Sequence, residues 1–272
     1  MRMALELAAS QASGLIEQIG TMTHFVELGV AAANGLRAAL WAQGGMTSIP
    51  DVLENPKGFC QFQAGKGGYN LEEMTRDLGK YYFVTEPGVS IKKYPCCYRT
   101  HRAIDATFEL LRENNVTYED VAEIRVDENL YDRQLLKYSE PVIGNDGRFS
   151  MEHCLAAVLV DGRVDEETFG DPKIRALKEA RKKVKVIVHE EWPSERSAAR
   201  TPVTLKLKSG KEYVKELDKP IDPTRDQIIE RYKAGARSIL TETEIEESAK
   251  KIIELEKVGN VRELMKLVKG RG

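Results

Sequence analysis

No apolar run in the sequence approaches the roughly 20 residues that a membrane-spanning helix requires. The first residues, Met1–Gly20, lack the long apolar core of a signal peptide and include Glu6. Four cysteines among 272 residues are too few for a disulfide framework. Neither charge predominates, since 41 Lys and Arg stand against 43 Asp and Glu. We therefore expect a cytoplasmic protein that binds neither membrane nor nucleic acid.

Motifs for common cofactors are also missing. The sequence has no Walker loop, no GxGxxG that opens a helix and no GxSxG elbow. Cys96, Cys97 and His101 do not suffice for zinc, because adjacent cysteines diverge and no second cysteine or histidine pair completes a tetrahedral set. We therefore expect no metal ion and no cofactor.

Helices are predicted for the part of the chain that precedes Pro87, because apolar residues recur there with helical spacing. The clearest helix is Phe25–Gln43, which is rich in alanine and ends at a pair of glycines. Shorter helices are predicted over Met3–Ile19, Pro50–Glu54 and Leu71–Leu78.

After Pro87 strands and helices alternate. Strands are predicted over Ser90–Lys93, Ala122–Asp127 and Val184–His189, and helices over His101–Glu113 and Phe149–Leu159. Two alternating runs that meet at Ser209 and Gly210 predict a β-hairpin. Helices return from Asp226 to Lys269.

This order of elements predicts an α+β fold. We expect an all-helical domain formed from both chain ends, with a smaller α+β domain inserted between them. The inserted domain holds a mixed or antiparallel sheet plus helices. The expected boundaries are 1–88 and 222–272 for the two parts of the helical domain and 89–221 for the inserted domain.

The segment Val89–Ala106 places several cations in one turn before a helix. Lys92, Lys93 and Arg99 supply positive charge, and Thr100 is a candidate N-cap with the positive end of the helix dipole behind it. This arrangement suits a small anionic ligand. The alternative is an ordinary solvated loop. His101 and Asp105 share one helix face, which fits either a local hydrogen bond or a catalytic pair.

A second candidate is the helix start FSMEHC, in which Ser150 caps the helix and His153 lies in the first turn. Burial and the positive helix end would both lower the pKa of His153 and leave a neutral imidazole able to act as a base. The alternative is a histidine that is merely satisfied within the core.

A third candidate lies at the start of the Gly/Ala-rich helix, where His24 and Glu27 stand about one turn apart. Glu27 would act as a base near neutral pH only if it were desolvated. The alternative is a solvated helix start, because unpaired Glu and His are seldom fully buried.

Three stretches of the chain together resemble the MmgE/PrpD family. They are GVAAANGLRAALWAQGGMTSIPDVLENPKGF (29–59), IKKYPCCYRTHRAIDA (91–106) and FSMEHCLAAVLVDG (149–162). The family includes 2-methylcitrate dehydratase, cis-aconitate decarboxylase and iminodisuccinate epimerase. The resemblance implies a helical domain built from both chain ends and a smaller α+β lid domain, which is the arrangement that the periodicity predicts.

The resemblance implies an enzyme, a lyase (hydro-lyase or carboxy-lyase) or an epimerase, that acts on a small polycarboxylate. The reaction would move a proton at a carbon next to a carboxylate, which needs cations to hold carboxylates and a base matched to the working pH. We expect four catalytic residues, with Lys92 holding a carboxylate and three histidines as acid, base or hydrogen-bonding groups: Lys92, His101, His153 and His24. Five more are expected to bind substrate: Lys93, Arg99, Thr100, Glu27 and Ser150.

The chain departs from the family pattern at several positions. Lys92 matches the lysine before the Tyr-Pro turn, whereas His24 and Glu27 stand where well-known members have a lysine and a histidine. His153 stands where members often have a tyrosine. Family members are also far longer, so part of the helical domain is expected to precede Met1. We therefore expect a homodimer or a complex with a separately encoded N-terminal half. The alternative is a truncated, non-catalytic subunit or remnant that needs a partner chain for activity.

Overall fold

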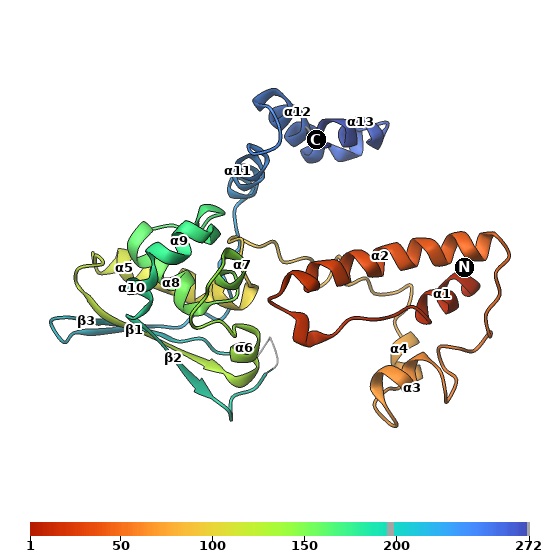
Figure 1. Cartoon of the computed structure of the whole chain (residues 1–272), viewed down its shortest axis with the longest axis horizontal. Helices are drawn as coiled ribbons and strands as arrows, with labels where there is room; N and C mark the ends of the chain where they lie inside the picture. The colour runs from red at the N-terminus through yellow and green to blue at the C-terminus, as the bar shows by residue number, and fades with distance from the viewer. Residues whose placement is uncertain (195–198, 271–272) are drawn as a thin grey trace. The chain divides into compact units, whose positions relative to one another are not determined.

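The computed structural model describes residues 1–194 and 199–270, which form two compact units, Met1–Val89 and Ser90–Gly272. Figure 1 shows both units, and each is described here by itself. Within the described residues we find no helix that combines the length and the apolar character needed to cross a membrane.

The first unit is helical. Its elements are α1 (Arg2–Ala9), the 3-10 turn η1 (Ile16–Gln18), α2 (Met22–Gln43), α3 (Phe59–Ala64) and α4 (Leu71–Thr75). The prediction of one helix over 3–19 is wrong, because the chain leaves helical geometry after Ala9 and Gly14 adopts a φ of +111°. The predicted helix over 50–54 is also wrong. Its turns are closed instead by Phe59 and Cys60, whose N–H groups donate to the carbonyls of Val52 and Leu53.

The second unit contains a four-stranded mixed sheet in the order β2-β1-β3-β4. The strands are β1 (Val121–Asn129), β2 (Val184–His189), β3 (Val203–Leu207) and β4 (Glu212–Lys215). β2 lies parallel to β1, whereas β3 is antiparallel to both β1 and β4. The predicted hairpin is therefore confirmed as β3–β4, with Gly210 in its turn at a φ of +86°.

The predicted strand over Ser90–Lys93 is wrong. Among the described residues these four lie outside the sheet, and the Lys92 carbonyl accepts a hydrogen bond from the Arg231 guanidinium instead of joining a ladder. Pro95, which follows closely, has no N–H group to give to a neighbouring strand.

Two predicted helices form the centre of this unit. They are α5 (His101–Glu113), which follows the 3-10 turn η2 (Tyr98–Thr100), and α8 (Met151–Asp161), which ends at Gly162 in the left-handed conformation. α5 and α8 pack on each other and, with α10 (Lys178–Arg181), cover one face of the sheet (Figure 1). The core between them is apolar and fully buried, and includes Ile104, Val121, Ile124, Val126, Leu155, Val158 and Leu205.

Shorter helices surround this core. They are α6 (Leu130–Leu135), α7 (Gly144–Gly147), η3 (Glu167–Phe169) and α9 (Asp171–Ala176). The C-terminal part of the chain is helical as predicted: α11 (Arg225–Ala236), α12 (Glu242–Ile253), η4 (Leu255–Lys257) and α13 (Val261–Leu267). Thr224 and Thr241 begin α11 and α12 with capping boxes. That these helices join the N-terminal ones in a single domain remains a prediction.

Candidate functional site

The turn before α5 packs directly against the segment that leads into α8. The Cys97 N–H donates to the Arg148 carbonyl at 2.8 Å, and the Arg148 guanidinium donates back to the Pro95 carbonyl. The structure therefore brings together two of the three sequence stretches that carry the predicted site. The third stretch, with His24 and Glu27, belongs to the other unit.

Lys93 is one of three cations predicted in this turn, and it is neutralised by a buried acid. Its ammonium lies 2.8 Å from Oδ1 of Asp105, whose side chain is 1% exposed. The Tyr94 hydroxyl donates to the same oxygen at 2.7 Å. Burial and this hydrogen bond raise the pKa of Tyr94 well above its usual range, so the phenol keeps its proton.

Arg99 is neutralised in the same way. Its guanidinium lies 3.0 Å from Oδ1 of Asp132, a buried carboxylate in α6, and it also stacks over the Tyr131 ring. Burial raises the pKa of Asp132 while Arg99 lowers it. Arg99 therefore connects the turn to α6 through its ion pair with Asp132.

Lys92 differs from both neighbours. Its side chain is exposed, and no carboxylate among residues 1–194 and 199–270 forms an ion pair with it. Burial raises the pKa of the nearby Cys97 thiol, and the Lys92 charge opposes that rise. Lys92 therefore keeps its charge available for an anion that comes from outside the turn.

Thr100 does not cap α5 through its side chain. The residue is fully buried, its backbone is helical, and its hydroxyl donates to the Cys97 carbonyl at 2.8 Å. The chain enters α5 directly from η2 instead of turning at an exposed cap. The Thr100 hydroxyl therefore stabilises the turn before α5 through its hydrogen bond to Cys97.

His101 is buried to 1% exposure, and its Nε2 has no hydrogen-bond partner among the described residues. Its ring lies between Tyr94 and Tyr98, with centroid distances of 5.1 Å and 4.9 Å. Buried polar atoms in folded proteins nearly always have a partner, so an unpaired one calls for an explanation. A ligand atom or a water molecule would supply the missing partner.

Cys96 lies beside this histidine in a buried cluster with Cys154. From the sequence, Cys96 was considered only as a possible zinc ligand and was not connected with Cys154. The Cys96 sulfur is 3.1 Å from the Thr100 hydroxyl. Burial alone would raise the pKa of Cys96, but hydrogen bonds with Cys154 and His101 outweigh it and lower the pKa to about 5. The same Cys96 hydrogen bond and burial raise the pKa of Cys154. In the sequence, Cys154 directly follows His153 and Cys96 lies four residues before Thr100, which were the signs that could have linked the two thiols to the site.

His153 is fully buried and is engaged at both ring nitrogens. Nε2 lies 2.9 Å from the Thr168 carbonyl and therefore donates to it, and Nδ1 lies 3.5 Å from the Arg181 guanidinium. Burial lowers the pKa of His153 to about 4, so the imidazole is neutral as predicted. Ser150 caps α8 as predicted, since its hydroxyl accepts the His153 N–H at 3.1 Å.

Two further buried carboxylates lie near the start of α8. Glu128, at the end of β1, is 1% exposed, and neither of its oxygens has a hydrogen-bond partner among the described residues. Burial raises the pKa of Glu128 to about 8, so it is largely protonated at neutral pH. Arg133 lies 3.9 Å from Glu128 and 3.1 Å from Glu152. The sign in the sequence was the pair of acidic residues Asp127 and Glu128 at the end of a predicted strand, which was not interpreted as part of a site.

His24 and Glu27 lie in the first turns of α2. Oε1 of Glu27 accepts the Leu15 N–H at 2.9 Å, and the carboxylate packs beside Gly14. The His24 ring contacts Phe25 at a centroid distance of 6.0 Å. Both side chains are partly exposed. Glu27 thus orders the segment before α2 through one oxygen.

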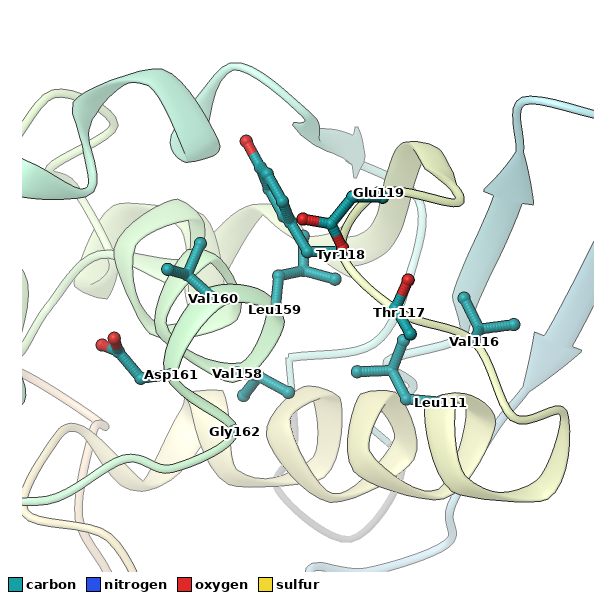
Figure 2. A pocket seen from close by; sticks show the side chains of 10 residues that line it. All are labelled: Leu111, Val116, Thr117, Tyr118, Glu119, Val158, Leu159, Val160, Asp161 and Gly162. Carbon is teal, nitrogen blue, oxygen red and sulfur yellow. The ribbon is translucent and has the colours of Figure 1, made fainter.

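An open pocket of about 480 Å³ lies at the far ends of α5 and α8 (Figure 2). Leu111 and Val116 line it on one side, and Val158–Gly162 on the other. None of the predicted site residues lines this pocket. Within residues 1–194 and 199–270 we also find no group of three or more His, Cys, Asp or Glu placed to hold a metal ion.

Two family models match this chain, one in each unit. Residues 1–72 match the MmgE/PrpD N-terminal domain, and residues 94–258 match the MmgE/PrpD C-terminal domain.

Curated relatives include cis-aconitate decarboxylase of Aspergillus terreus (strain NIH 2624 / FGSC A1156), which is 26% identical over 98% of this chain. The enzymes of the same name from Mus musculus and Homo sapiens are each 24% identical over 99% of the chain. The chain covers only 59% of the Aspergillus protein and 57% of each mammalian protein.

Proposed function

Since this chain belongs to the MmgE/PrpD family, we propose that it acts on a small polycarboxylate as a lyase or isomerase. The reaction removes or returns a proton at a carbon next to a carboxylate and uses no cofactor. Cis-aconitate and 2-methylcitrate are the substrates to test first. The observation that carries the proposal is the contrast among three neighbouring cations, of which Lys92 alone has no acidic partner among the described residues.

In this proposal Lys92 binds a substrate carboxylate. When a proton leaves the neighbouring carbon, negative charge spreads onto that carboxylate, so a fixed ammonium stabilises the transition state more than the ground state. Lys93 and Arg99 contribute by holding the turn, since Asp105 and Asp132 already neutralise them.

His101 is the proposed acid or base. Its unpaired Nε2 is the ring atom available for proton transfer, and Tyr94 and Tyr98 fix the plane of the ring. His153 and Ser150 take the hydrogen-bonding role instead, because Thr168, Arg181 and the α8 backbone occupy their polar atoms. His24 is the proposed second acid or base, with Glu27 as its neighbour in substrate binding.

The replacement Lys92→Ala tests this proposal. We expect turnover of cis-aconitate and 2-methylcitrate to be lost and their binding to be weakened but still measurable, while the protein stays folded, because the Lys92 side chain is exposed. Lys208→Ala is the matched control, since Lys208 is another exposed lysine of the same unit, located beside the hairpin turn. Wild-type activity in Lys92→Ala would refute the assignment of Lys92.

A second proposal is that the chain works only with a partner, as a homodimer or with a separately encoded N-terminal half. The supporting observation is α2, a helix of 22 residues in which only Ala38 is buried. Its exposed apolar side chains include Phe25, Leu28, Leu36 and Leu40. Apolar surface of this extent is typical of a contact with another chain. Light scattering of the purified protein tests this, and a stable monomer that turns over substrate would contradict it.

A further inference from the structure

Asp105 is a buried carboxylate of the second unit that accepts three hydrogen bonds, and the proposed chemistry does not use it directly. It lies in α5 one turn after His101 and is 1% exposed. Oδ1 accepts hydrogen bonds from the Lys93 ammonium at 2.8 Å and from the Tyr94 hydroxyl at 2.7 Å. Oδ2 accepts the Ile221 backbone N–H at 2.8 Å.

These donors come from two segments that are far apart in the sequence. Lys93 and Tyr94 belong to the segment that leads into α5, and Ile221 belongs to the segment that leads from β4 to α11. Asp105 therefore connects two segments of the chain. One leads into the sheet-containing part of the unit, and the other leads out of it. Ile221 lies 116 residues from Asp105 in the sequence, so this contact is a long-range one.

The charge on Asp105 is essential to this junction. A buried carboxylate is costly unless it is paired and hydrogen-bonded, and here one cation and two neutral donors satisfy it. An asparagine at the same position has nearly the same shape but no negative charge, and its amide NH2 would face groups that are themselves donors. Asp105→Asn is therefore a sharp probe of the junction.

The junction also fixes the position of Lys92, the residue that precedes Lys93 in the chain. Lys93 turns inward to Asp105, whereas the side chain of Lys92 is exposed. The Lys92 carbonyl in turn accepts from the guanidinium of Arg231 in α11, the helix that follows Ile221. The backbone of Lys92 is thus held between the entering segment and the leaving segment.

We propose that Asp105 is a positioning residue that joins the entering and leaving segments through Lys93, Tyr94 and Ile221 and thereby sets the place from which Lys92 reaches its anion. The role given to Lys92 rests on the proposed function. The junction itself rests only on the four residues and their contacts.

Hydrogen–deuterium exchange tests the junction. In Asp105→Asn we expect peptides that cover 89–95 and 218–222 to exchange at least about tenfold faster, because each loses its anchor. Asp222→Asn is the matched control, since Asp222 is the next residue after Ile221 but is 65% exposed and, among the described residues, pairs only with Lys219. Wild-type exchange in both peptides of Asp105→Asn, or equal acceleration in Asp222→Asn, would overturn the junction.

A double-mutant cycle tests the link to Lys92, with cis-aconitate binding measured by calorimetry. We expect Asp105→Asn to weaken binding about tenfold in the wild-type background and less than about twofold in Lys92→Ala. An equal loss in both backgrounds would show that Asp105 acts through something other than Lys92 and would overturn the positioning role. A purely structural defect would produce that equal loss.

Two further results allow the junction and the proposed function to be judged separately. If Lys92→Ala binds cis-aconitate like the wild type, the proposed function fails, while the exchange experiment still decides whether the junction exists. If Asp105→Asn does not fold, Tyr94→Phe replaces it, because that variant removes one hydrogen bond and keeps the ion pair with Lys93. We expect Tyr94→Phe to accelerate exchange of the same two peptides by a smaller factor, and wild-type exchange in it would overturn the junction.

Discussion

Two helices of the second unit each carry a buried histidine in the first turn, and the two side chains differ in their surroundings. Both ring nitrogens of His153 have a neighbour, the Thr168 carbonyl or the Arg181 guanidinium. Nε2 of His101 has no partner among the described residues, although that side chain is equally buried. A histidine whose polar atoms are all paired stabilises the fold, whereas one with an unpaired atom has capacity left for a ligand.

The largest effect is expected for His153→Ala. The replacement leaves a cavity beside Phe169 and removes the donor of the buried Thr168 carbonyl. We expect the free energy of unfolding to fall by about 4 kcal/mol, which combines the cavity and the unpaired carbonyl. Chemical denaturation measures it. A loss below about 1 kcal/mol would mean that His153 does not hold the fold as the contacts indicate.

The pH dependence of stability should report the same histidine. The pKa of His153 is lowered from 6.5 in the unfolded chain to about 4 in the fold, chiefly by burial. Between these values the unfolded state binds the extra proton. Stability from this group is therefore complete above pH 6.5 and is lost as the pH falls toward 4, by about 3 kcal/mol.

His153→Gln should remove this dependence, and denaturation curves at pH 4 and pH 7 measure the difference. If the variant keeps the full wild-type dependence between these two pH values, the shift belongs to another group.

Glu128 extends the comparison to an acid, because it is buried and has no hydrogen-bond partner among the described residues but carries its own proton. Burial raises its pKa from 4.5 in the unfolded chain to about 8. The stability that it contributes is complete below pH 4.5 and is lost as the pH rises through 8. We expect Glu128→Gln, which cannot ionise, to stabilise the protein at pH 8 by about 4 kcal/mol. Thermal unfolding at pH 5 and pH 8 checks this, and a variant less stable than the wild type at pH 8 would contradict it.

The smallest effect on stability is expected for His101→Gln. The replacement has a similar volume. It removes the hydrogen bond between His101 and Cys96, but Nε2 has no hydrogen bond among the described residues to lose, so we expect a change below about 1.5 kcal/mol. Binding or turnover of cis-aconitate should nevertheless be strongly reduced. Wild-type binding with a large loss of stability would reverse the comparison and make His101 the structural histidine.

Local patterns predicted much of the fold. Apolar periodicity indicated α5 and α8, alternation indicated the β3–β4 hairpin, and Ser150 was correctly expected to cap α8. Each of these depends on neighbours within one or two turns of the chain. The predicted strand over 90–93 failed because isolated alternation does not reveal whether a partner strand is available.

The site was less predictable because pairing over long distances decides it. The sequence placed Lys92, Lys93 and Arg99 in one turn, but it did not show that Asp105 and Asp132 occupy two of them. Asp132 belongs to a different helix, so only the folded chain brings it to Arg99. His101 and His153 likewise could not be distinguished from the sequence, because both were predicted near the start of a helix.

The measurement that tests the account most directly is two-dimensional NMR of the imidazole nitrogens of ¹⁵N-histidine-labelled protein, titrated with cis-aconitate. His101→Gln and His153→Gln assign the two sets of signals. We predict that the His101 nitrogens shift on binding while those of His153 stay in place. Binding that moves the His153 signals and leaves those of His101 unchanged would contradict the account.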